Sequence, residues 1–141
     1  MNPEIENKIR ASFDAQSMMT SIGAELKTVQ SGNVVITSPV LEGFRQQQDF
    51  AHGGLIFTLG DSAAGYAALS VMPLDMEVMT VELKINIMAP APASGMLIAQ
   101  GKVLKPGRRL VIVASEVWCE DTDGHRVQVA ALQGTMIPVN P

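Results

Sequence analysis

The chain has a single cysteine, Cys119, in 141 residues, so it cannot form a disulfide within itself. Aromatic residues make up only 4%, and the formal net charge of -4 has the wrong sign for phosphate backbones. Proteins that bind nucleic acid need cationic surface and stacking platforms, so we expect no nucleic-acid partner. The two histidines and the cysteine are widely separated and offer no metal-ligand spacing, so we expect no metal and no other cofactor.

The amino-terminal segment lacks the apolar run of a secretory leader, because Glu4 and Glu6 interrupt it. We therefore expect a cytoplasmic protein. Residues 53–72 are long enough and apolar enough to suggest a membrane span, but Asp61 lies near the middle and no lysine or arginine marks either end. This segment is predicted to be a buried helix.

A content of 47% hydrophobic and 17% charged residues is typical of a globular protein. No repeat, low-complexity tract or linker divides the chain, and we expect one domain over residues 1–141. Asn2 and Pro3 are suited to start a short amphipathic helix whose apolar stripe is Ile5, Ile9 and Phe13. Residues 24–39 are predicted to form two strands around a turn at residues 31–33, and residues 41–50 a loop or short irregular helix.

Residues 79–87 show the clearest period-two alternation, which indicates a half-buried strand. One face would carry Met79, Val81, Leu83, Ile85 and Ile87, and the other Thr80, Glu82, Lys84 and Asn86. Three further strands are expected at residues 96–104, 108–120 and 126–137. We therefore predict an α+β fold with an antiparallel sheet wrapped around one long central helix, preceded by a short amino-terminal helix.

The predicted central helix is apolar on nearly all sides, and one sheet covers only one of them. A second copy of the chain related by a two-fold axis could cover the other side, so we predict a dimer.

The segment His52, Gly53 and Gly54 opens this helix. The free N–H groups of a first helical turn can stabilise a developing oxyanion, and two adjacent glycines let a ligand approach the backbone closely. The alternative interpretation is that the glycines only make the start of the helix flexible. Asp61, in an apolar helix, needs a partner, a proton or a chemical role. Eight helical residues separate Asp61 from Gly53 by about 12 Å, too far for one reacting carbonyl to contact both. If both act, they come from different protomers.

The order of elements, the His-Gly-Gly segment at residues 52–54, Asp61 and the small residues 62–65 resemble the hotdog-fold acyl-CoA thioesterases of the phenylacetate-degradation (PaaI) type, from about residue 23 to 137. The resemblance implies that Asp61 is the general base or nucleophile and that the Gly53 N–H polarises the thioester carbonyl. It implies a site amide at Gln46, with Gln47 and Gln48 left open, and a site hydroxyl at Thr80. Thr80 could instead be a solvent-facing strand residue.

The resemblance further implies an acyl-CoA substrate and a homodimer, itself able to pair into a dimer of dimers, with no membrane partner. His52 and Gly54 would line the substrate site, and Lys105, Arg108 and Arg109 could contact the coenzyme A phosphates or form a solvated turn. Two other functions stay open: a hotdog hydratase or dehydratase that uses His52, and a non-catalytic acyl-CoA binding module. The acyl specificity cannot be read from the sequence.

Overall fold

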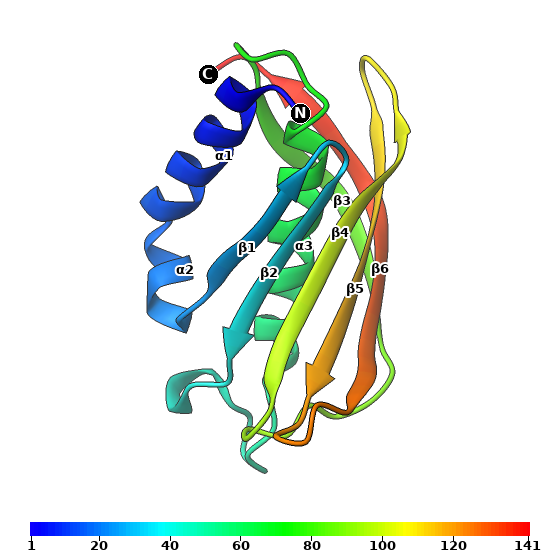
Figure 1. Ribbon diagram of the computed structural model, residues 1–141. Helices are drawn as coiled ribbons and strands as arrows, with labels where there is room; N and C mark the ends of the chain where they lie inside the picture. Colours follow the sequence, from blue (N-terminus) through cyan, green and yellow to red (C-terminus); the bar gives the residue numbers. More distant parts are fainter.

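The computed structural model describes residues 1–141 as a six-stranded antiparallel sheet curved around one long helix (Figure 1). The helical elements are α1 (Pro3–Ala15), α2 (Ser17–Ile22), the 3-10 turn η1 (Glu42–Phe44) and α3 (Gly53–Leu69). The strands are β1 (Glu25–Gln30), β2 (Asn33–Pro39), β3 (Glu77–Ile87), β4 (Met96–Pro106), β5 (Val111–Glu120) and β6 (Arg126–Val139). The sheet order β1-β2-β4-β5-β6-β3 leaves β1 and β3 as its edges. The predicted hotdog arrangement is confirmed.

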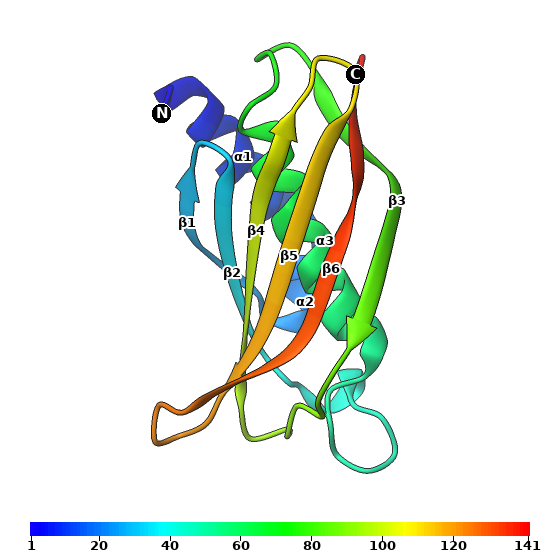
Figure 2. The same ribbon diagram turned by 90° about the vertical axis from the view of Figure 1, so that its right-hand side faces the viewer.

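The long helix α3 lies in the concave face of the sheet, and β3 runs antiparallel to it along one edge (Figure 2). Leu55, Leu59 and Ala63 are buried in α3, as expected for a helix held against the sheet. None of the helices combines the length with the hydrophobicity that a membrane crossing requires.

The amino-terminal helices cover the side of α3 that faces away from the sheet (Figure 1). The Asn2 side chain caps α1 by accepting a 2.9 Å hydrogen bond from the Glu4 N–H, as predicted. The ring centroids of Phe13 and Tyr66 lie 6.2 Å apart, and the Tyr66 hydroxyl is 3.1 Å from the Ser12 hydroxyl. Helix α1 therefore covers part of α3 that the sequence analysis had left to a second copy of the chain, and the dimer stays a prediction.

A bulge in β3 corrects the predicted alternation of that strand. Thr80 pairs with Met136 of β6, whereas Glu82 pairs with the next residue, Thr135, so Val81 is an extra residue without a partner. Met136 is buried on the side of α3, and Thr80 therefore points to the helix side. The alternation had placed Thr80 on the same face as Glu82 and Lys84. This prediction is wrong, because the extra residue at position 81 turns the side chains that precede it to the opposite face of the sheet.

The turn between β5 and β6 and the end of β5 hold the chain's cysteine and a polar cluster. Cys119 is buried in β5, as expected for an inert thiol, and burial, followed by the nearby Asp121 charge, raises its pKa. Hydrogen bonds from the backbone N–H groups of His125 and Asp123 lower the pKa of the Asp121 carboxyl. These bonds account for the grouping of Asp121, Asp123 and His125, whose ligand atoms lie within 4.8 Å of one another at the exposed turn.

Candidate functional site

The start of α3 presents one backbone donor without a partner. His52 is the N-cap: its Nδ1 accepts a 2.8 Å hydrogen bond from the Gly54 N–H, and its carbonyl accepts bonds from the Leu55 and Ile56 N–H groups. The Gly53 N–H has no acceptor in the chain. Because His52 occupies the Gly54 N–H, Gly53 supplies the free donor at the positive end of the helix dipole.

Gly53 lies in the wall of a pocket of about 420 Å³ between the start of α3 and the end of β3. Gln46 lines the same pocket, whereas Gln47 and Gln48 do not. The Gln46 side-chain oxygen accepts a hydrogen bond from the Gln48 N–H, which leaves the amide N–H groups of Gln46 free to donate. The pocket therefore offers two kinds of donor, one from the backbone and one from a side chain.

The loop that carries Gln46 is closed by local backbone bonds. The Gln46 N–H donates to the Phe50 carbonyl at 2.9 Å, and the Asp49 N–H donates back to the Gln46 carbonyl at 3.2 Å. Asp49 adopts a positive φ of 61°, a conformation that aspartate tolerates better than most residues. Three successive glutamines give no sequence signal for which one faces the helix, so the fold of this loop decides it.

Asp61 lies about two turns further along α3 and does not line that pocket. The Thr80 hydroxyl donates a 2.8 Å hydrogen bond to Asp61 Oδ1 and lies 3.1 Å from the Met136 sulfur. The β3 bulge thus makes the Asp61–Thr80 contact possible. Asp61 is half-buried rather than enclosed, because it lies on the one side of α3 that neither the sheet nor α1 covers.

An uncovered stripe runs along α3 beside the free edge of β3. Its half-buried residues recur at helical spacing and are Phe57, Thr58, Asp61, Ser62 and Gly65. The adjacent strand exposes about half of three apolar side chains, Met79 (54%), Val81 (55%) and Ile87 (52%). An unpaired strand edge with exposed apolar side chains is a template for pairing with another strand.

Two contacts fix the relation of α3 to β3. A Cβ added at Gly53 would lie 3.0 Å from Ile87 Cδ1, and Asp61 is bonded to Thr80. Gly53 and Asp61 therefore lie at different levels of the same edge, about 12 Å apart along the helix axis. Within one chain, a single carbonyl cannot contact both groups.

Gly65 gives a stability prediction for the uncovered stripe. A Cβ added there meets no atom within 4 Å, so Gly65→Ala should raise the free energy of unfolding by about 0.5–1 kcal/mol through helix propensity. The matched control is Gly60→Ala, whose added Cβ would lie 2.8 Å from Leu132 side-chain atoms and should destabilise. Chemical denaturation of both variants measures the effect, and a destabilised Gly65→Ala would contradict this description of the stripe.

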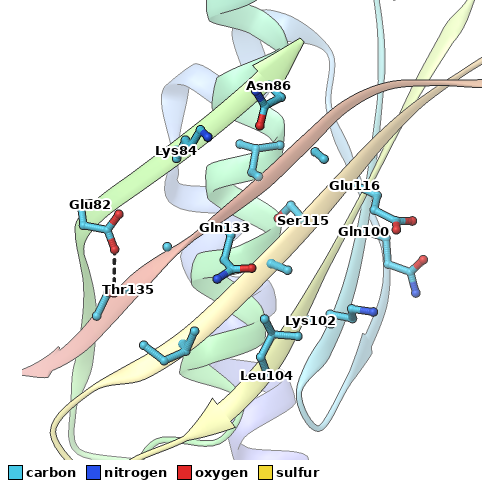
Figure 3. A pocket seen from close by; sticks show the side chains of 15 residues that line it. Glu82, Lys84, Asn86, Gln100, Lys102, Leu104, Ser115, Glu116, Gln133 and Thr135 are labelled. Atoms are coloured by element: carbon cyan, nitrogen blue, oxygen red, sulfur yellow. Dashed lines mark hydrogen bonds between the residues drawn. The ribbon is translucent and has the colours of Figure 1, made fainter. Parts of the chain in front are cut away.

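A second hollow lies on the outer face of the sheet, on the side away from α3 (Figure 3). It has a volume of about 830 Å³, and its polar lining includes Glu82, Lys84, Lys102 and Glu116. The Thr135 hydroxyl donates to Glu82 at 2.6 Å. This hollow shares no residue with the pocket at the start of α3 and holds neither Asp61 nor Thr80.

The predicted phosphate-binding residues lie elsewhere in the chain. Lys105, Arg108 and Arg109 are exposed at the turn between β4 and β5, and none of them forms a salt bridge. This turn lies at the opposite end of the molecule from the start of α3 (Figure 1). One chain therefore does not bring these cations near Gly53.

Comparisons with known proteins agree on one family. Residues 48–124 match the family described as the thioesterase superfamily. A solved thioesterase family protein from Silicibacter pomeroyi is 33% identical with a TM-score of 0.91, covering 97% of this chain and 99% of that chain. The Escherichia coli PaaI protein from the phenylacetic acid degradation operon shares the fold, with 20% identity and a TM-score of 0.85 over 97% of this chain and 94% of its own. A 1,4-dihydroxy-2-naphthoyl-CoA hydrolase of Listeria monocytogenes is 27% identical over 101 residues, 72% of this chain and 77% of its own.

Proposed function

Because the chain belongs to the thioesterase superfamily and is a thioester hydrolase, we propose that it hydrolyses acyl-CoA thioesters at a site formed between two copies. The observation that carries this proposal is that the hydrogen-bond donors and the acid lie apart within one chain. The free Gly53 N–H and Gln46 share a pocket that contains no acid, while Asp61 and Thr80 lie on the uncovered stripe.

The free edge of β3 supports the assembly. In an antiparallel pairing of β3 with the partner's β3, Ile87 can lie level with the partner's Thr80. Within one chain, Ile87 lies beside Gly53 and Thr80 lies beside Asp61. A pairing that sets Ile87 opposite the partner's Thr80 therefore brings Gly53 to the same height along the strands as the partner's Asp61. The exposed apolar side chains of β3 would then be covered by the partner strand. Pairing of such dimers into tetramers stays a prediction.

The chemistry assigns one role to each group. The thioester oxygen accepts hydrogen bonds from the Gly53 N–H and the Gln46 amide, which stabilise the negative charge that develops on it. Asp61, held by the Thr80 hydroxyl, takes a proton from an attacking water or attacks the carbonyl itself. With water as the nucleophile, the C–S bond breaks, the coenzyme A thiolate takes the proton from Asp61, and the free acid is released. With Asp61 as the nucleophile, C–S cleavage leaves an anhydride between the acyl group and Asp61, which a water molecule then hydrolyses to the free acid and the Asp61 carboxylate, its two protons going to the thiolate and to solvent.

The relatives support coenzyme A as the thiol, since one of them is named a naphthoyl-CoA hydrolase. A two-fold axis across β3 reverses the two ends of the molecule. The partner's β4–β5 turn, with its Lys105, Arg108 and Arg109, would then lie at the end where Gly53 lies. These unpaired cations are the candidates for the coenzyme A phosphates.

Thiol release from short, medium, long and aryl acyl-CoAs tests the proposal directly. We expect release with at least one class, detected by a thiol reagent, and a dimer by light scattering. Hydration of an enoyl-CoA without thiol release would instead indicate the hydratase function. Tight acyl-CoA binding without turnover would indicate a binding module. Either of these last results would refute the proposal.

A further inference from the structure

The pocket beside Gly53 carries no charged side chain. Gln46 is its single polar side chain, and the rest of its wall is apolar or small: Phe50, Ala51, Ile56, Ile87, Met88, Ala89, Pro90 and Ala91. We propose that this pocket holds the acyl group of the substrate and that it accepts uncharged, apolar acyl groups while rejecting those that end in a carboxylate. This inference rests on the proposed function and adds the substrate class.

Part of the backbone of the pocket wall is already hydrogen-bonded. The Ala51 N–H donates to the Ala91 carbonyl at 2.8 Å, and the Met88 N–H donates to the Val129 carbonyl at 2.8 Å. Pro90 has no N–H. Beyond Gly53 and Gln46, which the thioester oxygen would occupy, these parts of the wall have no donor left for a ligand.

The apolar side chains of the wall decide which part of the substrate fits. The pantetheine arm of coenzyme A carries two amides and a hydroxyl, and each would lose hydrogen bonds to water on entering such a pocket. A hydrocarbon or aryl group loses none and gains apolar contact. The acyl group is therefore the better occupant of the pocket, and the pantetheine arm must leave in another direction.

The same wall disfavours a second carboxylate on the acyl group. The nearest cation in sequence, Arg45, does not line the pocket and donates through Nε to the Val40 carbonyl at 3.0 Å. In the proposed dimer, the partner's Asp61 adds a negative charge beside the pocket. The partner's Lys105, Arg108 and Arg109, at this end of the proposed dimer, are assigned to the coenzyme A phosphates and do not line the pocket. A charged acyl end would thus be desolvated without a cation of its own and would face an anion.

Met88 is the position at which charge selection can be altered. It lies at the pocket wall and is 53% exposed, so a lysine there can place its ammonium at the pocket mouth without entering the core. Met18→Lys is the matched control substitution, because Met18 is exposed on α2 and does not line the pocket.

The test compares hexanoyl-CoA with adipoyl-CoA, which has the same number of carbons but ends in a carboxylate. We expect the wild-type kcat/KM for hexanoyl-CoA to exceed that for adipoyl-CoA by at least about 100-fold. Met88→Lys should reduce this ratio by about 10- to 100-fold, because a charged hydrogen bond to the carboxylate is gained. Met18→Lys should leave the ratio unchanged. Light scattering and circular dichroism establish that each variant remains folded and associated.

The outcomes separate this inference from the proposed function. Equal hydrolysis of hexanoyl-CoA and adipoyl-CoA by the wild type would overturn the inference while supporting the hydrolase. A Met88→Lys variant that stays folded and loses activity equally on both substrates would assign the pocket to pantetheine and also overturn it. Failure of the wild type to release thiol from any acyl-CoA would instead refute the proposed function. Because the wild-type ratio needs no variant, the inference is testable even if Met88→Lys fails to fold.

Discussion

Asp61→Asn is expected to lower turnover of the best acyl-CoA by about 100- to 10,000-fold, the range that a positioned base contributes. Asparagine keeps the volume of aspartate and can still accept the hydrogen bond from Thr80, but it cannot take a proton or act as a nucleophile. Because Asp61 lies half-buried on the uncovered stripe, the free energy of unfolding should change little. Thiol release and chemical denaturation of the same preparation measure the two effects.

Ser62→Ala is the matched control for this variant. Ser62 follows Asp61 on the same stripe and carries a hydroxyl, but it lacks the Gly-x-Ser-x-Gly turn that activates a serine. Its removal should leave turnover within a few-fold of the wild type. Loss of activity in Ser62→Ala together with normal activity in Asp61→Asn would show that the acid has been assigned the wrong role.

Gly53→Pro is expected to lower turnover by about 100- to 1,000-fold, the effect of removing one oxyanion donor. Proline deletes the Gly53 N–H and is well tolerated at the first position of a helix. The preceding residue, His52, already has φ -62° and ψ 140°, the extended conformation that a following proline requires. Helix α3 should therefore form normally, and circular dichroism should show an unchanged spectrum.

Gly53→Ala separates the donor from the added bulk. Both substitutions introduce a Cβ, which meets the flexible end of the Ile87 side chain at 3.0 Å, but alanine keeps the N–H. We expect Gly53→Ala to retain most of the activity that Gly53→Pro loses. If the two variants were equally impaired, crowding at Ile87 rather than loss of the donor would explain the defect.

Local signals predicted most of the elements that the structure contains, with α2 the exception. Asn2 and Pro3 marked the start of α1, because a cap and a proline act within one turn of the helix. The glycine pair after His52 marked the start of α3 for a similar reason. The position of Asp61 on α3 and its separation from Gly53 also followed from helix geometry alone.

The features that sequence reasoning missed depend on contacts between distant segments. The bulge at Val81 is defined by pairing with β6, so the alternation of β3 by itself turned Thr80 to the wrong face. Helix α1 packs over Tyr66 of α3, a contact between segments more than 50 residues apart that local patterns do not encode. Because of this packing, the exposed part of α3 is only a narrow stripe. The choice of Gln46 among three glutamines depends on the closure of its loop.

Co-expression of Gly53→Pro and Asp61→Asn chains with different affinity tags tests most directly whether the two halves of the site come from different copies. Each variant alone should be nearly inactive. In a mixed dimer one site combines the intact Gly53 of one chain with the intact Asp61 of the other, so random association should restore about a quarter of the wild-type activity. Purified mixed dimers that stay as inactive as the parents would place both groups in the same chain and contradict the account.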